Sequence, residues 1–332
     1  MLYVYTITLF VLSFISVYLA TRMYIKYAER KGILAPDIHK PGQPLVANRG
    51  GVSLLSMVPI LLLISYVASE SFSSNIFLEA ISLTLSFLIT AIVGFLDDLY
   101  DLGLLKVPLM ILGGLPFIIL NTYTPRPYVP FVGFTRLTIV YPLGILVAFL
   151  IIPNAYNMID VHNGVMCFSA ISVIIALIFW LAVLGRQELM LAAGVLGGIL
   201  GFYAWNKYPA KVFPGNIGAY SVGALVTAII ILSRLEYIAL IALLPVILRG
   251  FYLINSIGGI MTKEAIREKI GKPVYVKDGV IYPARNPNAP FSLTRMFVLI
   301  YGPMTEAQVI RKYYELFIFS SILAILTGFL MF

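Results

Sequence analysis

The 332-residue chain has little charge, a single cysteine and two histidines. Asp, Glu, Lys and Arg make up 11% of it, against roughly one quarter in soluble domains. Cys167 has no second cysteine to pair with, which excludes an internal disulfide and any site built from several thiolates. Hydrophobic residues account for 60% of the chain and the mean hydropathy is +0.96. The composition therefore indicates a protein whose solvent is the bilayer.

Ten apolar runs are long enough to cross a hydrocarbon core of about 30 Å. We predict an all-α polytopic integral membrane protein, one domain over residues 1–332, with about ten transmembrane helices. The first run lacks a basic start and a cleavage site, so we expect a span rather than a removed signal peptide. The runs cover residues 2–21, 52–68, 76–96, 104–120, 137–153, 165–184, 188–205, 217–233, 235–257 and 313–332.

The basic residues are concentrated in alternate loops of this arrangement. The positive-inside tendency places those loops in the cytoplasm and both termini outside, in a multi-pass protein of the cell membrane. The net charge of +8 is compatible with nucleic-acid binding, but the cations lie in short loops between spans, which favours contact with membrane lipid and no nucleic-acid partner. The opposite loops hold Arg126, Arg136, Arg186 and Arg234.

The last cytoplasmic loop, residues 258–312, is long enough to contain structure of its own. Within it, Asp278-Gly279 lies between two β-prone runs, which is a strong signal for a small β-hairpin. Ser292 and Thr305 are placed to cap two further helices, the second running into the last span. A short charged helix is predicted at 262–270.

Two adjacent carboxylates stand where the third apolar run ends. Asp97 and Asp98 are followed one helical turn later by Asp101, and Lys106 adds a cation on the same face. Mg²⁺ usually binds one or two carboxylates together with phosphate oxygens and water. Acidic residues are disfavoured at a helix carboxyl terminus, so we favour a metal site over a solvated helix end.

Amides and one carboxylate recur at three-residue intervals after the fifth run. This spacing lines one helix face, where donors and acceptors together can read a nucleobase or a sugar. Turn formation and capping explain the amide that precedes Gly164, but they explain the other three less easily. His162, one of two histidines, is uninformative alone. The spaced residues are Asn154, Asn157, Asp160 and Asn163.

Further basic groups are expected on the same face. Lys207 and Lys211 precede the glycine-containing loop 213–218 and a helix start, which suits a phosphate, although interfacial lysines and a turn are the commoner explanation of such a segment. In the first loop, Lys40 and Arg49 are each explained as positive-inside anchors when taken alone.

Taken in order, these segments resemble the polyprenyl-phosphate N-acetylhexosamine-1-phosphate transferases of glycosyltransferase family 4. The likeness covers nearly the whole chain and is greatest to the archaeal and eukaryotic branch, which makes N-acetylglucosaminyl-diphospho-dolichol. It implies a helical bundle around a cytoplasmic groove, a UDP-sugar and a polyprenyl or dolichyl phosphate as substrates, and UMP as a product. The matching motifs are Arg49-Gly50-Gly51, Asp97-Asp98 with Lys106, residues 154–164 and residues 213–218.

The resemblance also implies roles for individual residues. Mg²⁺, with Mn²⁺ as an alternative, would be bound by Asp98 and by the residue at position 216. Asp97 would face the attacking lipid phosphate, the two aspartates being exchangeable in these roles, and Lys106 would contact phosphate. Family members often form homodimers, so a homodimer is a further expectation. Expected substrate contacts are Asn154, Asn157, Asp160, Asn163, Lys40, Arg49, Lys207, Arg249, Arg285 and Arg295.

The positions of Arg249 and Arg285 in the sequence give further reasons to expect these two contacts. Arg249 stands within an apolar run, where an arginine either serves function, here by facing the lipid phosphate, or snorkels to an interface. Arg285 lies in the proline-rich segment 283–290, which we predict to be a sugar-facing lid. The peptidoglycan branch carries a histidine cluster in this loop and the present chain has none, which disfavours a muramoyl-pentapeptide substrate.

The chain departs from the family at position 216, where Asn216 stands in place of the usual aspartate. An amide oxygen can coordinate Mg²⁺, but the lost charge should weaken binding. This motivates an alternative hypothesis of a catalytically impaired paralogue that binds nucleotide-sugar or lipid phosphate. A transporter is a third hypothesis. It is disfavoured because the carboxylates fall at one membrane edge rather than near the midplane.

Overall fold

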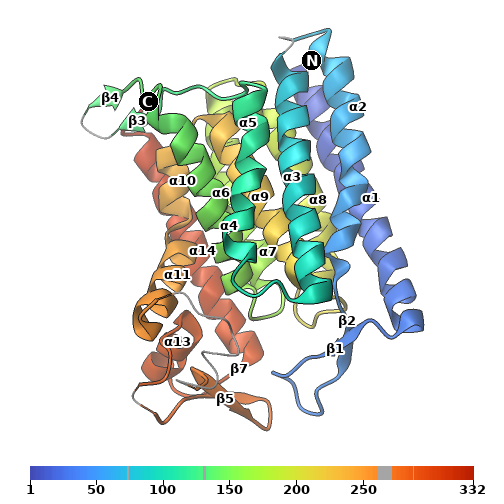
Figure 1. The fold of residues 1–332 in the computed structure, drawn as a ribbon, viewed down its shortest axis with the longest axis vertical. Coiled ribbons are helices and arrows are strands. Elements are labelled where there is room, and N and C mark those ends of the chain that lie inside the picture. Colours follow the sequence, from blue (N-terminus) through green and yellow to red (C-terminus); the bar gives the residue numbers. More distant parts are fainter. Residues whose placement is uncertain (73–74, 130–131, 260–270, 287) are drawn as a thin grey trace.

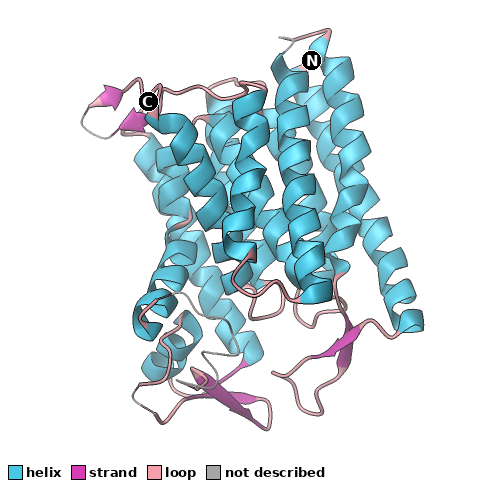
Figure 2. Ribbon diagram, viewed as in Figure 1, coloured by secondary structure: helices cyan, strands magenta, loops and turns pink. Residues whose placement is uncertain are grey.

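The computed structural model describes residues 1–72, 75–129, 132–259, 271–286 and 288–332. Long helices lie side by side to form its body (Figure 1), and the strands lie at the two ends of the bundle (Figure 2). Both termini lie at one end, while β1, β2, β5 and β7 lie at the other (Figure 1). Termini at the same end agree with an even number of crossings.

The elements follow one another along the chain as follows: α1 (Leu2–Lys31), β1 (Leu34–Pro36), β2 (Leu45–Ala47), the 3-10 helix η1 (Gly50–Met57), α2 (Val58–Ser69), α3 (Asn75–Tyr100), α4 (Lys106–Leu109), the 3-10 helix η2 (Met110–Gly114), α5 (Leu115–Ile119), β3 (Tyr128–Val129), β4 (Gly133–Phe134), α6 (Val140–Ile159), α7 (Val165–Val183), α8 (Leu189–Asn206), α9 (Gly215–Ser233), α10 (Glu236–Ala242), α11 (Leu244–Ile257), β5 (Val274–Lys277), β6 (Val280–Pro283), α13 (Leu293–Tyr301), β7 (Met304–Thr305) and α14 (Glu306–Gly328).

Among the described residues, seven helical segments are long and apolar enough to cross a membrane. The pair α10 and α11 forms an eighth if it is one span, bent by 60°, with Pro245 in the first turn of α11 where a missing N–H favours a break. The segments 106–119 and 306–328 also match predicted runs, but the first is short and the second begins with charged residues. The all-α polytopic class is confirmed, while the count of ten stays a prediction.

Helix α9 forms the centre of the bundle. Every residue from Ile217 to Ser233 is buried, and α9 packs against α3, α6 and α7. A helix that is apolar on all sides is buried among other elements. The surrounding helices therefore fix the position of the first turn of α9.

Helix α1 packs on α8 through glycines. A Cβ added to Gly197 would lie 2.2 Å from the carbonyl oxygen of Phe10, and one added to Gly201 would lie 2.6 Å from that of Phe14. Small residues let helix backbones approach closely in membranes. The buried residues of α1 recur at every fourth position from Leu9 to Thr21, which is the narrow stripe that such a contact needs.

Local signals in the last loop are confirmed where the structure describes it. The β5–β6 hairpin turns at Asp278 and Gly279, whose φ angles are 52° and 77°. Ser292 caps α13, and Thr305 forms a capping box with Gln308 at the start of α14. The helix predicted at 262–270 lies outside the described residues. The hairpin tip reaches the first loop, since a Cβ on Gly279 would lie 2.9 Å from Pro41.

Candidate functional site

Two of the sequence motifs, residues 49–51 and residues 213–218, are joined by backbone contacts, and we call this contact the joint. The N–H of Gly50 donates to the carbonyl of Phe213 at 2.8 Å, and that of Gly51 donates to the carbonyl of Pro214 at 2.9 Å. A Cβ on Gly51 would lie 2.2 Å from the Cα of Gly218, so a side chain there would force the two segments apart. The start of η1 is thereby fixed against the start of α9.

The carboxyl end of α3 joins this contact. A Cβ on Gly94 would lie 2.7 Å from the backbone of Asn216 and Ile217. One turn further along α3, the two carboxylate oxygens of Asp98 accept the N–H groups of Asn216 at 2.9 Å and Ile217 at 3.0 Å. Unpaired N–H groups at a helix amino terminus attract negative charge. Asp98 is therefore held by the first turn of α9.

Asp97 and Lys106 form a buried ion pair beside it. The ammonium of Lys106 lies 3.1 Å and 3.0 Å from the two carboxylate oxygens of Asp97, and one of these oxygens also accepts the N–H of Leu102 at 3.0 Å. The Asp97 side chain is fully buried, whereas that of Lys106 is 20% exposed. The lysine can therefore meet a ligand that its aspartate cannot reach.

The two predicted magnesium ligands, Asp98 and Asn216, offer side-chain oxygen atoms, which are the ligands that a hard cation such as Mg²⁺ takes. A carboxylate has about four lone-pair positions, and the two backbone N–H groups leave both oxygens of Asp98 able to bind further. Asn216 is half-buried on the same first turn of α9. Asp101 does not belong to this group, because its side chain is 74% exposed and lies 3.9 Å from Lys106.

Arg49 contacts the same corner from the first loop. Its guanidinium donates to the main-chain carbonyl of Asp98, at the end of α3. Its own backbone adopts φ of 61° immediately before the two glycines. Arg49 thus anchors the joint, and it lies next to the predicted metal ligand.

The residues spaced by three after α6 have separate partners. The Asn154 amide donates to the carbonyls of Leu150 at 2.7 Å and Val107 at 3.3 Å, which ties α6 to α4. Asn157 donates to the hydroxyl of Tyr220 on α9 at 3.0 Å. Asp160 follows the last residue of α6. The predicted common face is therefore partly used for helix packing.

Asn163 connects this loop to the first loop. Its side-chain oxygen accepts from Lys40 at 2.6 Å and from the backbone N–H of Ala210 at 2.9 Å. Lys40 also pairs with Asp37, which is buried. The structure thus brings two predicted substrate contacts, Lys40 and Asn163, into direct contact.

The remaining predicted contacts are more dispersed. Lys207 lies on a hollow of about 250 Å³ between α8 and α14. Arg249 on α11 is buried, and its Nε and one terminal nitrogen have no hydrogen-bond partner among the described residues. Arg295 is also buried, and its guanidinium donates to the carbonyls of Asn286 and Ala289. The interactions of Arg295 thus shape the loop before α13.

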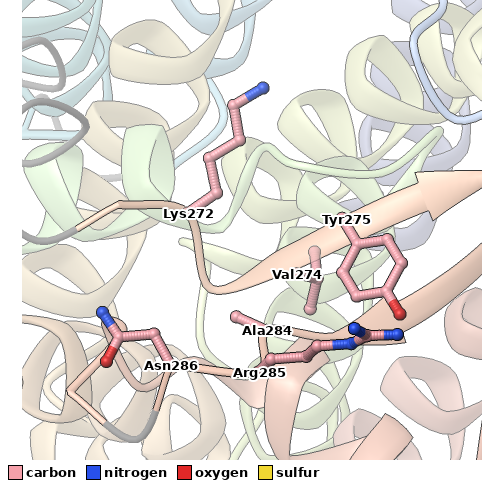
Figure 3. Close-up of a pocket in the computed structure, with 6 residues that line it drawn as sticks. All are labelled: Lys272, Val274, Tyr275, Ala284, Arg285 and Asn286. Carbon is pink, nitrogen blue, oxygen red and sulfur yellow. The ribbon is translucent and has the colours of Figure 1, made fainter.

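Arg285 lies at a larger hollow of about 430 Å³ beside the β5–β6 hairpin. Figure 3 shows its guanidinium close to Tyr275, with Lys272 on the facing segment and Asn286 next in the chain. Two cations with an aromatic ring and an amide suit an anionic or sugar ligand. The hollow has no lining residue in common with the Asp97–Asp98 corner.

One polar cluster was missed by the sequence reasoning. The rings of His39 and His162 lie with their centroids 4.6 Å apart and are tilted by 38°, and both face the buried carboxylate of Glu306 at 3.6 Å and 3.7 Å. The two histidines are 123 positions apart, and Glu306 opens a helix whose sequence reads as a capped amino terminus. The one available signal was that the chain has two histidines, each in a predicted loop of the same face.

Comparison with known proteins finds one matching family model and several relatives that are named as transferases. A family model described as glycosyl transferase family 4 matches residues 80–234. A protein of Saccharolobus solfataricus named UDP-N-acetylglucosamine–dolichyl-phosphate N-acetylglucosaminephosphotransferase is 30% identical over 226 residues, which cover 66% of this chain and 68% of that protein. A protein of Sulfolobus acidocaldarius with the same name matches to the same extent. A phospho-N-acetylmuramoyl-pentapeptide-transferase of Streptococcus pyogenes is 31% identical over 249 residues, 66% of this chain and 70% of that protein.

Proposed function

Because the chain belongs to glycosyl transferase family 4, we propose that it transfers N-acetylglucosamine-1-phosphate from a UDP-sugar to a polyprenyl or dolichyl phosphate. The products are a lipid-diphospho-sugar and UMP, and the reaction opens the assembly of a lipid-linked glycan. The archaeal relatives carry this activity in their names. The Streptococcus pyogenes relative is named for transfer of a phospho-N-acetylmuramoyl-pentapeptide, so transfer of a phosphosugar is the element that the names share.

The observation that carries the proposal is the convergence at the start of α9. Asp98 accepts two N–H groups there, Lys106 is held by Asp97 within reach of solvent, and Arg49 binds the end of α3. Lys106 and Arg49 place two cations at the carboxyl end of α3, and such cations bind phosphate groups through charge-assisted hydrogen bonds. Arg49, the segment from Asp97 to Lys106 and the first turn of α9 come from different parts of the chain, so the convergence is a property of the fold.

The reaction brings two anions together. An oxygen of the lipid phosphate forms a bond to the β-phosphorus of the UDP-sugar, the bond from that phosphorus to the α–β bridging oxygen breaks, and UMP leaves. The protein must therefore position the two substrates and offset their charges. Lys106 contributes a cation that Asp97 orients, and Arg49 stands beside the same corner.

We propose that Asp98 and Asn216 bind Mg²⁺, with Mn²⁺ as an alternative. When bound, the ion would offset the charge of the diphosphate. The support is chemical: carboxylate and amide oxygens lie on adjacent segments, and Asp98 retains lone pairs beyond its two hydrogen bonds. Asn216 contributes no charge, so affinity for the ion should be lower than in a site with two carboxylates.

We further propose that this end of the bundle is the cytoplasmic face. The support is the excess of lysine and arginine in the loops that join these motifs. A lipid phosphate would then enter from the bilayer toward Arg249, while the UDP-sugar would arrive from solvent. Asn157, Asp160 and Asn163 would contact the nucleotide, and the hollow at Arg285 would take the sugar or diphosphate.

The test is a product assay. Membranes containing the chain are given labelled UDP-N-acetylglucosamine and dolichyl phosphate, with and without Mg²⁺, and the lipid fraction is counted. We expect a labelled lipid that depends on the metal, and more of it from Asn216→Asp because that variant adds a carboxylate beside Asp98. If neither form yields a lipid product with any UDP-sugar tested, the enzymatic proposal is abandoned.

Asn216 favours one other candidate function. A catalytically impaired relative would bind UDP-sugar or lipid phosphate without transferring between them. It would retain UDP-sugar binding with no turnover, and Asn216→Asp would restore activity. Turnover by the unchanged chain would exclude this candidate.

A further inference from the structure

We propose that His39, His162 and Glu306 form a divalent transition-metal site, best suited to Zn²⁺ and separate from the magnesium site at Asp98. One ligand atom from each of the three residues lies within 4.8 Å of the others. The three come from the first loop, the loop after α6 and the start of α14. The inference does not depend on the proposed transferase activity.

The distances are close to those around a bound ion. Tetrahedral Zn²⁺ with ligands at about 2.0–2.1 Å holds its ligand atoms about 3.3 Å apart. The Nδ1 atoms of His39 and His162 lie 3.6 Å and 3.7 Å from the same oxygen of Glu306. Small side-chain rotations would shorten these two nitrogen–oxygen distances to the value expected around the ion. They would also bring the two neighbouring rings, whose centroids are 4.6 Å apart, around the ion.

One unsatisfied atom points into the site. The Nδ1 of His162 is buried and has no hydrogen-bond partner among the described residues, and it faces Oε1 of Glu306 at 3.7 Å. This oxygen accepts the N–H of Asn163 at 3.3 Å and keeps lone pairs for a cation. A cation between the two side chains would satisfy the nitrogen, which is costly to leave unpaired when buried.

The second nitrogen of His162 is already engaged. Its Nε2 lies 3.0 Å from the hydroxyl oxygen of Thr294, which in turn lies 3.0 Å from the hydroxyl of Tyr313. When Nε2 carries the proton of that hydrogen bond, the lone pair of Nδ1 is free for a metal. An outer hydrogen bond of this kind is what orients histidine ligands in metal sites.

His39 supplies the third ligand and an entry path. Its side chain is 14% exposed, which leaves a route for an ion and room for a water as a fourth ligand. Imidazole with one carboxylate suits zinc rather than magnesium.

A cation already lies near the cluster. The ammonium of Lys40 is 3.5 Å from Glu306, but it also pairs with Asp37 and donates to Asn163. The carboxylate of Asp37 offsets its charge, so Glu306 remains available. A metal here would tie together the segments that carry Lys40 and Asn163, two of the predicted substrate contacts.

The test measures bound metal directly. The full chain, purified in detergent with an affinity tag free of histidine, is treated with chelator, incubated with Zn²⁺, passed through a desalting column and analysed by mass spectrometry. We expect about one zinc per chain, retained in a large excess of Mg²⁺. Co²⁺ in place of Zn²⁺ should give the intense visible absorption of a tetrahedral site.

The variants are His39→Ala, His162→Gln and Glu306→Gln, with Glu315→Gln as the matched control because Glu315 lies on the same helix at the surface. The first three should lose most of the zinc and the cobalt spectrum, and the control should keep both. If His162→Gln fails to fold, His39→Ala in the first loop, where the side chain is less deeply buried than that of His162, still decides the question. A metal-free unchanged chain, or full zinc content in the folded ligand variants, would overturn the proposal.

Discussion

The Asp97–Lys106 pair shows how a single residue can act through another. Asp97 is buried and both of its oxygens face the lysine, whereas Lys106 reaches solvent. The sequence hypothesis gave Asp97 a role toward the lipid phosphate. Its contacts favour a positioning role, with Lys106 as the group that meets phosphate.

Replacing Lys106 by Ala should therefore lower the rate. Loss of one charged donor at a phosphoryl-transfer site costs roughly 10²–10³ in kcat, and here it also leaves Asp97 as an unpaired buried charge. The measurement is kcat for lipid product at saturating UDP-sugar. Asp101→Asn is the matched control, because this exposed carboxylate lies 3.9 Å from Lys106. It should retain activity within about threefold. Equal losses in the two variants would contradict the assignment.

Arg249 leads to a prediction about one substrate. Its buried guanidinium has unpaired nitrogens among the described residues, and a hydrogen bond to a charged group is worth about 1.5–3 kcal/mol. Arg249→Gln should raise KM for dolichyl phosphate by about tenfold or more while KM for the UDP-sugar stays unchanged. Arg311→Gln, on the exposed surface, should change neither. Parallel rises in both constants for Arg249→Gln would argue for a general packing role.

Among the secondary-structure elements, the joint of α3, η1 and α9 depends on residues without side chains. Gly51 and Gly94 face the backbone at the start of α9, and Asp98 and Arg49 are positioned by those contacts. An added methyl group in such a place typically costs about 1–3 kcal/mol through overpacking.

Gly94→Ala should lower the melting temperature of the detergent-solubilised protein and reduce activity, because it pushes α3 from α9 and displaces Asp98. Gly144→Ala provides the control: it lies inside α6 with no atom within 4 Å of the added Cβ. Alanine favours the helix there, so its stability should be equal or slightly higher. Thermal melting followed by circular dichroism measures both. A stable, active Gly94→Ala protein would show that the joint tolerates separation.

Local elements could be predicted from sequence because their causes are local. The hairpin at Asp278-Gly279 and the caps at Ser292 and Thr305 depend on neighbouring residues. The family resemblance implied that Asp98 and position 216 lie together, but local sequence could not predict that two backbone N–H groups of α9 hold Asp98, since 118 positions separate the two. The histidine pair was missed for the same reason. Motif order indicated a shared face, but contacts between loops require the packed helices.

At the scale of the whole molecule, both termini lie opposite the site (Figure 1). The proposed orientation in the membrane rests on the distribution of charge, and the seven or eight apolar helices among the described residues support a multi-pass protein without fixing its direction.

Cysteine labelling can test the orientation, because Cys167 is fully buried and should stay unreactive. In intact cells, a membrane-impermeant maleimide should label Val132→Cys, beside β4, and should not label Asp278→Cys at the tip of the β5–β6 hairpin. Inside-out vesicles should reverse the pattern. Labelling of Asp278→Cys from outside intact cells would overturn the proposed cytoplasmic site.

The contact between the hairpin tip and the first loop has a consequence for how this kind of protein can diversify. The joint at α9 is fixed by backbone contacts, whereas Gly279 meets Pro41 through loop tips alone. Loops can change without disturbing the helices that support them. If the hollow at Arg285 takes the sugar as proposed, these loops can change the sugar that is accepted while the joint keeps the chemistry of transfer. Relatives named for different sugars are the outcome expected in that case.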